Sequence, residues 1–165
     1  MLHIARSMAQ LNFSRLMDVY IEGNRENAAD LYPDLPEGQG LLQAEQDFYQ
    51  YLRQVFFAVP GAYYAILREN GEYVSALRIE PYKDGVLLAA LETAPCHRNK
   101  GHAEQLVRAV LSKEKKVYSH VSKNNGASLR VHEKCGFARI WEQAVYIDGS
   151  VNGKCCTLCY GKNGE

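Results

Sequence analysis

The sequence lacks any run of about 18 consecutive apolar residues, the length that a helix needs to cross a bilayer. It also lacks net charge, because nineteen Lys and Arg residues balance nineteen Asp and Glu residues. The first absence indicates no membrane span, and the second argues against nucleic-acid binding through bulk positive charge. The start of the chain has no long apolar segment typical of a signal peptide, so we expect a cytoplasmic protein.

The five cysteines include no two pairs at the spacing that a zinc site requires. Cys156 and Cys159 form a C-x-x-C motif, but a redox motif of this kind begins a helix. The surrounding residues Lys154–Tyr160 instead have the pattern of a terminal strand. We therefore expect reduced, mostly buried thiols and no metal site.

Length and periodicity predict one domain over residues 1–165, since 165 residues with 47% hydrophobic side chains can bury one substantial core. The order of predicted elements indicates an α/β (α+β) domain with a mixed sheet. The predicted elements, in chain order, are a strand at Leu2–Ala5, helices at Phe13–Asn27 and Leu41–Phe57, strands at Ala62–Arg68, Tyr73–Glu80 and Gly85–Thr93, a helix at Ala103–Lys113, a strand at Val117–Val121, a helix at Ala127–Lys134, and strands at Ala138–Tyr146 and Lys154–Tyr160.

The most informative segment is the basic, glycine-containing loop at residues 98–103, which reads Arg-Asn-Lys-Gly-His-Ala. It follows an apolar strand and opens an amphipathic helix with Leu106, Val107, Val110 and Leu111 at helical spacing. The first N–H groups of a helix lack partners and carry partial positive charge, so they stabilise a bound anion such as pyrophosphate. Gly101 allows the ligand to approach the backbone closely.

A second motif lies downstream at residues 125–137, which read Asn-Gly-Ala-Ser-Leu-Arg-Val-His-Glu-Lys-Cys-Gly-Phe. This pattern predicts a short helix ended by Gly136 and followed by a strand. Together the two motifs resemble the GNAT superfamily of N-acetyltransferases, with its motifs Q/R-x-x-G-x-G/A and N-x-x-A-x-x-x-Y-x-K-x-G-F. The resemblance is close over residues 86–137, although Ser128 replaces the alanine and His132 replaces the tyrosine.

The resemblance implies the GNAT acyltransferase fold, acetyl-CoA (coenzyme A) as cofactor, and two central strands that separate to admit the cofactor between them. The backbone groups freed by that separation bind the acetyl carbonyl and the pantetheine arm in family members. The cofactor-binding residues that the resemblance implies are Leu91, Glu92, Thr93, Arg98, Asn99, Lys100, Gly101, His102, Ala103, Glu104, Asn125 and Ser128.

Acetyl transfer needs a neutral amine, a polarised carbonyl and a proton for the leaving thiolate. Glu92 ends the central strand and is the candidate base, either directly or through water, unless strand alternation turns its carboxylate away. His132 occupies the position of the family's proton-donating tyrosine and is the candidate acid, because an imidazolium donates a proton at near-neutral pH. The alternative is a histidine that only packs, with Tyr118, Tyr146 or a water as donor.

The charge distribution favours a cationic acceptor. Residues 96–134 carry nine basic and three acidic side chains, whereas residues 18–50 carry eight acidic side chains and one arginine. A basic half suits an anionic cofactor and an acidic half suits an amine. We expect an enzyme that acetylates a primary amine of a small molecule or peptide, with a non-catalytic acyl-CoA-binding module and an interaction domain as alternatives. A homodimer is the expected oligomer.

Overall fold

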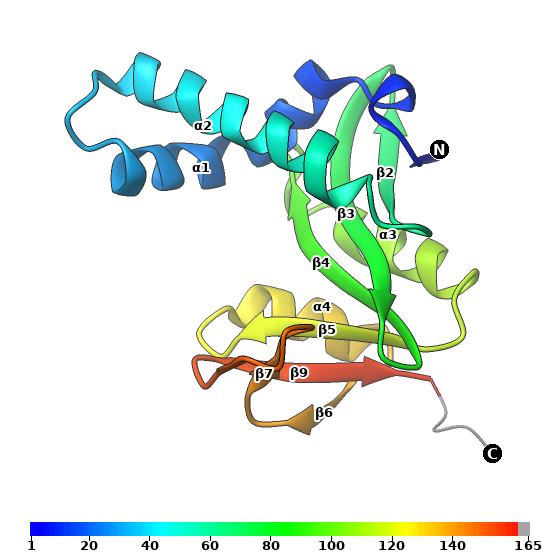
Figure 1. The fold of residues 1–165 in the computed structure, drawn as a ribbon. Coiled ribbons are helices and arrows are strands. Elements are labelled where there is room, and N and C mark those ends of the chain that lie inside the picture. The colour runs from blue at the N-terminus through cyan, green and yellow to red at the C-terminus, as the bar shows by residue number, and fades with distance from the viewer. Residues whose placement is uncertain (162–165) are drawn as a thin grey trace.

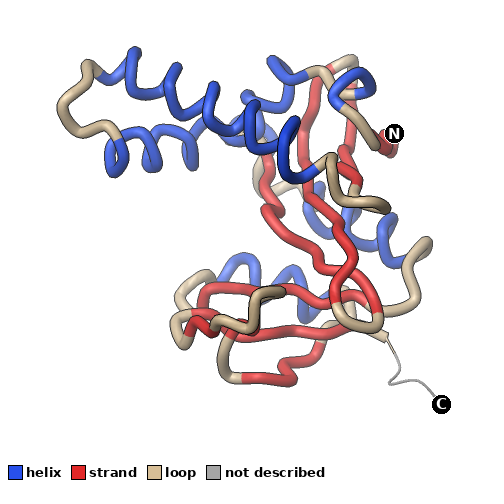
Figure 2. The backbone as a smooth tube through the Cα atoms, viewed as in Figure 1, coloured by secondary structure: helices blue, strands red, loops and turns tan. Residues whose placement is uncertain are grey.

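The computed structural model describes residues 1–161, which form a seven-stranded mixed sheet with helices on both faces (Figures 1 and 2). The strand order is β1-β2-β3-β4-β5-β9-β6; β4 and β5 are parallel and the other neighbours are antiparallel. The strands are β1 (Leu2–Ala5), β2 (Tyr63–Glu69), β3 (Glu72–Tyr82), β4 (Gly85–Thr93), β5 (Val117–Ser122), β6 (Ala138–Trp141) and β9 (Cys155–Tyr160), with β7 (Ala144–Val145) and β8 (Val151–Asn152) as a separate small hairpin.

The helices are α1 (Phe13–Leu31), α2 (Glu37–Tyr51), α3 (His102–Leu111) and α4 (Gly126–Lys134). A π-helical turn at Leu52–Phe56 continues α2, and short 3₁₀ turns occupy Met8–Gln10 and Pro95–His97. This arrangement confirms the predicted mixed α/β architecture. No helix among residues 1–161 combines the length and apolar character needed to span a membrane.

Strand β2 explains why both faces of the sheet are covered. Its successive side chains alternate between two hydrophobic clusters, because neighbouring residues of a strand point to opposite faces. Tyr64 and Ile66 pack with α1 and the π-helical turn, whereas Ala65 and Leu67 pack with residues of α3. The far end of the α1–α2 hairpin projects away from the sheet (Figure 1).

The parallel pair β4–β5 positions the site. Backbone pairing joins residues 86–88 of β4 to residues 117–119 of β5 and stops there. Beyond this point the two strands run in different directions (Figure 1). In the same region β4 carries a bulge, because Ala76 pairs with Glu92 but Arg78 pairs with Ala89. Ala90 lies in the left-handed region with a φ of 54°, so the bulge bends β4 where its partner leaves.

Three predicted elements had wrong boundaries. Helix α1 continues to Leu31 rather than ending at Asn27. Helix α2 begins at Glu37 rather than Leu41, because Pro36 stands directly before the helix and Gly40 lies against Ala28 of α1 rather than in a loop. The predicted strand Ala138–Tyr146 is divided into β6 and β7. Strand β6 pairs with β9, and the turn at residues 148–150 belongs to the β7–β8 hairpin.

Candidate active site

A cleft of about 510 Å³ opens beside the end of β4, between the loop that follows it and helix α4. It brings together most of the residues that the sequence predicted for cofactor binding. Lys100 is exposed and does not line it. The lining residues are Leu91, Glu92, Thr93, His97, Arg98, Asn99, Gly101, His102, Ala103, Glu104, Asn125, Ala127, Ser128, Arg130, Val131 and Lys134.

The loop before α3 has the conformation that a phosphate-binding loop requires. Gly101 is the N-cap of α3 with a φ of 79°, and Asn99 also lies in the left-handed region. The first-turn N–H groups of α3 have no intrahelical carbonyl acceptors and point out of its end. A Cβ atom at Gly101 would meet no atom within 4 Å apart from its chain neighbours and the backbone of α3, so no other part of the protein crowds the backbone at this position.

Arg98 does not point freely into this space. Its Nη1 atom lies 2.8 Å from Oε2 of Glu22 on α1, and its Nε donates to the Thr93 carbonyl at 3.3 Å. The arginine therefore ties the loop to α1. Two other basic side chains that the sequence reasoning did not select, Arg130 and Lys134, line the cleft from α4. Their spacing of four residues on one helix face was the signal that would have found them.

A smaller cavity of about 170 Å³ lies where β4 and β5 separate, and it shares Leu91, Asn125 and Ser128 with the cleft. The Asn125 side chain accepts a hydrogen bond from the Ser128 N–H at 3.1 Å, so Asn125 caps α4 at the junction of the two spaces. Ser119 and His132 line the inner end of this cavity. The arrangement suits a long, narrow ligand entering from the cleft.

His132 is buried and both of its ring nitrogens have partners. Nδ1 lies 2.7 Å from the Ser128 carbonyl oxygen, which can only accept, so Nδ1 carries the proton. Nε2 lies 2.8 Å from Oγ of Ser119 and accepts from that hydroxyl when the ring is neutral. Burial lowers the pKa of His132, and the hydrogen bond to Ser128 opposes that shift. The resting histidine is therefore neutral at pH 7.

Glu92 is exposed at the mouth of the cleft, and its backbone carbonyl accepts a hydrogen bond from the Ser75 hydroxyl at 2.8 Å. The pKa of its carboxyl is raised, first by partial loss of water and then by the like charges of Glu22 and Glu26, while Arg98 opposes the shift. A raised pKa makes a carboxylate a stronger base than an ordinary glutamate.

The two tyrosines proposed as alternative acids lie elsewhere. The Tyr118 hydroxyl donates to Asp84, beside the start of β4, and its ring packs with Tyr82 and Trp141. Tyr146 accepts a hydrogen bond from Asn152 of the β7–β8 hairpin and contacts His120. Neither residue lines the cleft or the inner cavity.

Two polar residues of this region escaped the sequence reasoning. Ser119 pairs with His132, and the Tyr20 hydroxyl of α1 donates to the Ala90 carbonyl of the bulge at 2.6 Å. Strand alternation placed Ser119 on the same face as Val117 and Val121, which was a usable signal. The contact of Tyr20 joins residues seventy positions apart, and the sequence gives no signal for it.

Comparison with known families decides the identity of this fold and cleft. The model of the Acetyltransferase (GNAT) family matches residues 25–137, which is more than half of the chain and includes the loop at residues 98–103 and α4. The chain belongs to the GNAT acetyltransferase family. It is therefore an N-acetyltransferase that uses acetyl-CoA, and this assignment favours a catalytic role over a non-catalytic acyl-CoA-binding module.

Solved structures agree on the fold. The PaiA N-acetyltransferase from Thermoplasma acidophilum, in complex with coenzyme A, has a TM-score of 0.62 at 12% identity and covers 98% of this chain and 99% of its own. The spermidine N-acetyltransferase from Vibrio cholerae, with CoA and spermine, has a TM-score of 0.58 at 16% identity, covering 96% and 94%. The ribosomal-protein-S18-alanine N-acetyltransferase from Escherichia coli has a TM-score of 0.53 at 15% identity, covering 73% and 79%. Curated protein sequences yield no match.

Proposed function

We propose that this GNAT enzyme transfers the acetyl group of acetyl-CoA to a primary amine that is cationic in solution. The observation that carries this proposal is that Glu92, which lines the cleft, lies close enough to Glu22 and Glu26 of α1 for their negative charges to raise the pKa of its carboxyl. Arg98 neutralises Glu22 in part, at 2.8 Å. The remaining negative charge attracts an ammonium group and repels an acidic substrate.

In this proposal, acetyl-CoA occupies the cleft and the inner cavity. Its pyrophosphate is held by the N–H groups at the start of α3, with Arg130 and Lys134 supplying positive charge from α4. Its pantetheine arm follows the separated edge of β4, at residues 91–93, past Asn125 into the inner cavity. The arm then pairs with β4 in place of the missing strand, in the manner of an added strand.

The chemistry follows from the groups around the thioester. The neutral amine attacks the carbonyl carbon, and its nitrogen loses a proton to the Glu92 carboxylate directly or through one water. The tetrahedral intermediate then expels the thiolate of coenzyme A, so the new C–N bond replaces the C–S bond. A proton must reach that thiolate before coenzyme A leaves as a thiol.

His132 and Ser119 form the proposed route for that proton. Because the neutral ring holds its proton on Nδ1 toward the Ser128 carbonyl, only the imidazolium form supplies a proton through Nε2 and the Ser119 hydroxyl. The lowered pKa of His132 makes this form scarce at neutral pH. A water in the inner cavity is the competing donor, and the pH dependence of turnover distinguishes the two.

Polyamines are the first acceptors to test. The Vibrio cholerae neighbour is a spermidine N-acetyltransferase crystallised with spermine, and a polyamine carries the positive charge that the acidic side of the cleft favours. A peptide amine is the second class, since the Escherichia coli neighbour is named for alanine of a ribosomal protein. A cytoplasmic location and a homodimer stay predictions from the sequence.

The test is a panel of amines assayed for acetyl-CoA-dependent thiol release, with spermidine, a lysine peptide, an alanine-terminated peptide, glutamate and aspartate. We expect the highest kcat/KM with a cation and about a tenfold rise in its KM in the double variant Glu22→Gln, Glu26→Gln. Asp30→Asn is the matched control, because Asp30 lies farther along α1 and is exposed. If kcat/KM were highest with glutamate or aspartate, the proposal of a cationic acceptor would be wrong, whereas the assignment to the GNAT family would not be affected.

A further inference from the structure

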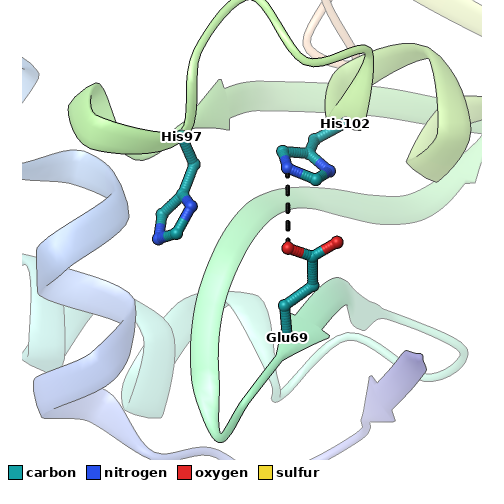
Figure 3. Close-up of side chains that lie close together, drawn as sticks. All are labelled: Glu69, His97 and His102. Carbon is teal, nitrogen blue, oxygen red and sulfur yellow. Dashed lines mark ion pairs between the residues drawn. The ribbon is translucent and has the colours of Figure 1, made fainter.

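A cluster of potential metal ligands lies beside the phosphate loop. Glu69 ends β2, His97 lies in the 3₁₀ turn after β4, and His102 is the first residue of α3. One side-chain atom of each lies within 4.8 Å of the others, and Nε2 of His102 is 3.7 Å from Oε2 of Glu69 (Figure 3). The fold therefore brings one carboxylate and two imidazoles together from three separate elements.

His102 is the unusual member of this cluster. Its side chain is only 7% exposed, yet neither ring nitrogen has a hydrogen-bond partner among the described residues. Buried polar atoms nearly always have a partner, because an unsatisfied one has lost its hydrogen bonds to water without replacing them. The distance of 3.7 Å to Glu69 is too long for a hydrogen bond, but it leaves space in which an ion would contact both groups.

His97 is oriented by a second carboxylate. Its Nε2 lies 3.0 Å from Oε2 of Glu72 on β3, and because an ionised carboxylate only accepts, Nε2 donates. The lone pair of the neutral ring is then on Nδ1. Figure 3 shows one ring nitrogen of His97 turned toward His102 and Glu69 and the other turned away. A carboxylate that holds a histidine in this way is a common outer partner of metal-binding histidines.

We propose that Glu69, His97 and His102 bind a divalent transition-metal cation, with Zn²⁺ as the best match. Two imidazole nitrogens and one carboxylate oxygen form a donor set that zinc accepts, with its fourth position left to water. The carboxylates of Glu69 and Glu72 balance the charge of the dication. Bond lengths near 2.0–2.2 Å require the ligand atoms to close in by roughly 1 Å, which the exposed Glu69 side chain permits.

The site differs from what the sequence indicated. The sequence predicted no metal site, since its only spacing motif was the incomplete C-x-x-C pair. The ligands proposed here have no regular spacing. His97 and His102 also line the cofactor cleft, so the cation would tie the β2–β3 hairpin to the edge of the phosphate loop. Binding of the cation is independent of the acceptor proposed above.

The test is calorimetric titration of the chelator-treated full-length chain with Zn²⁺, repeated with Co²⁺ to record its visible spectrum. We expect one equivalent to bind, with a cobalt spectrum that lacks a thiolate charge-transfer band. Glu72→Gln should weaken binding about tenfold, because removal of an outer partner typically costs 10- to 100-fold, and Glu69→Gln, which removes a ligand itself, should weaken it by a larger factor. Glu133→Gln, an exposed substitution outside the cluster, is the matched control.

Thermal unfolding gives a second measurement that does not depend on activity. Zn²⁺ should raise the Tm of the unchanged chain and of Glu133→Gln but not that of Glu69→Gln, because a ligand stabilises only the state that binds it. An isotherm of Glu69→Gln equal to that of the unchanged chain would overturn the proposal. A strong thiolate band, or no binding at millimolar Zn²⁺, would overturn it as well.

Discussion

The two ends of the β4–β5 pair differ in backbone pairing, in the regularity of β4 and in the residues that surround them. At the end where β4 begins, the strands are hydrogen-bonded, and Asp84 accepts from Lys116 at 2.7 Å and from Tyr118. At the other end the strands are apart, β4 is bulged at Ala90, and polar residues surround a cavity. We call these the closed end and the open end.

The comparison shows how one strand pair both stabilises the fold and admits a ligand. The closed end fixes the point from which the strands diverge, because backbone pairing there leaves no freedom in register. At the open end, the edge of β4 that faces β5 is not paired with it beyond Leu88, so backbone groups there are available to another partner. In the proposed complex, acetyl-CoA would pair with this edge of β4 in the manner of an added strand.

The largest effect is expected at the loop facing the open end. Gly101→Glu places a negatively charged side chain at the start of α3, where the cofactor phosphates are proposed to bind. It also forces a residue with a side chain to adopt the backbone φ of 79° that Gly101 has. We expect acetyl-CoA affinity to fall on the order of 10³-fold, since like charges brought together cost several kcal/mol. Calorimetry checks this, with Gly149→Glu as control at another left-handed glycine, one that does not line the cleft. Unchanged affinity would remove the phosphate-loop assignment.

The second prediction concerns the inner wall of the open end. If His132 donates the proton, His132→Ala should lower kcat by about 10²-fold with little change in cofactor affinity, and His132→Tyr should restore part of it. Because only the imidazolium donates and burial lowers its pKa, kcat of the unchanged enzyme should fall as pH rises through that lowered value. The control is Tyr118→Phe at the closed end, which should keep kcat. A kcat of His132→Ala equal to that of the unchanged enzyme would leave His132 a packing residue.

The third prediction concerns the base at the mouth of the open end. Glu92→Gln should lower kcat/KM by about 10²-fold, near the lower limit for loss of a general base. The carboxylate is the active form and its pKa is raised, so the activity of the unchanged enzyme should fall as pH drops through that raised value. The variant should lose this acid limb. Full activity in Glu92→Gln would assign proton removal to water alone.

The fourth prediction tests the closed end. A Cβ atom at Gly85 would overlap the Lys116 carbonyl oxygen, so Gly85→Val must separate the strands where they are paired. Overpacking of this kind typically costs about 1–3 kcal/mol of unfolding free energy, which denaturant titration measures. Gly38→Val, where a side chain meets nothing within 4 Å, is the control. Equal stability of the two variants would show that the closed end is not a fixed junction.

The sequence predicted the closed end far better than the open end. Apolar alternation and helical spacing gave β4, α3, β5 and α4 to within about two residues, because each is defined by its own local pattern. The bulge had no such pattern. Alanine carries no preference for a positive φ, so only the long-range contacts of β4 explain the conformation of Ala90.

The candidate site was predictable where it depends on backbone and motif, and less so where it depends on tertiary contacts. The loop at residues 98–104 and Asn125 could be identified from helix-end chemistry and the family motifs, and all but Lys100 line the cleft. The ion pair of Arg98 with Glu22 and the pairing of His132 with Ser119 could not, since their partners lie far away in the sequence. Patterns of spacing do not encode such contacts.

The smallest effect is expected from the hydrogen bond that supports the bulge. Tyr20→Phe removes the hydroxyl that donates to the Ala90 carbonyl. The partly buried carbonyl then lacks this donor, and Ala90 loses a contact that holds it at a positive φ. One hydrogen bond contributes about 1 kcal/mol, so we expect a loss of that size in unfolding free energy and roughly a fivefold loss in kcat/KM.

Tyr64→Phe is the matched control for this prediction, because the Tyr64 hydroxyl donates to Tyr20 at 3.2 Å without touching the bulge. It should cost similar stability and leave kcat/KM nearly unchanged. Ala90→Gly should recover activity in the Tyr20→Phe background, since glycine adopts a positive φ without the penalty that alanine carries. If both tyrosine variants lose the same activity, the bulge does not depend on Tyr20, and the open end is shaped by β3 alone.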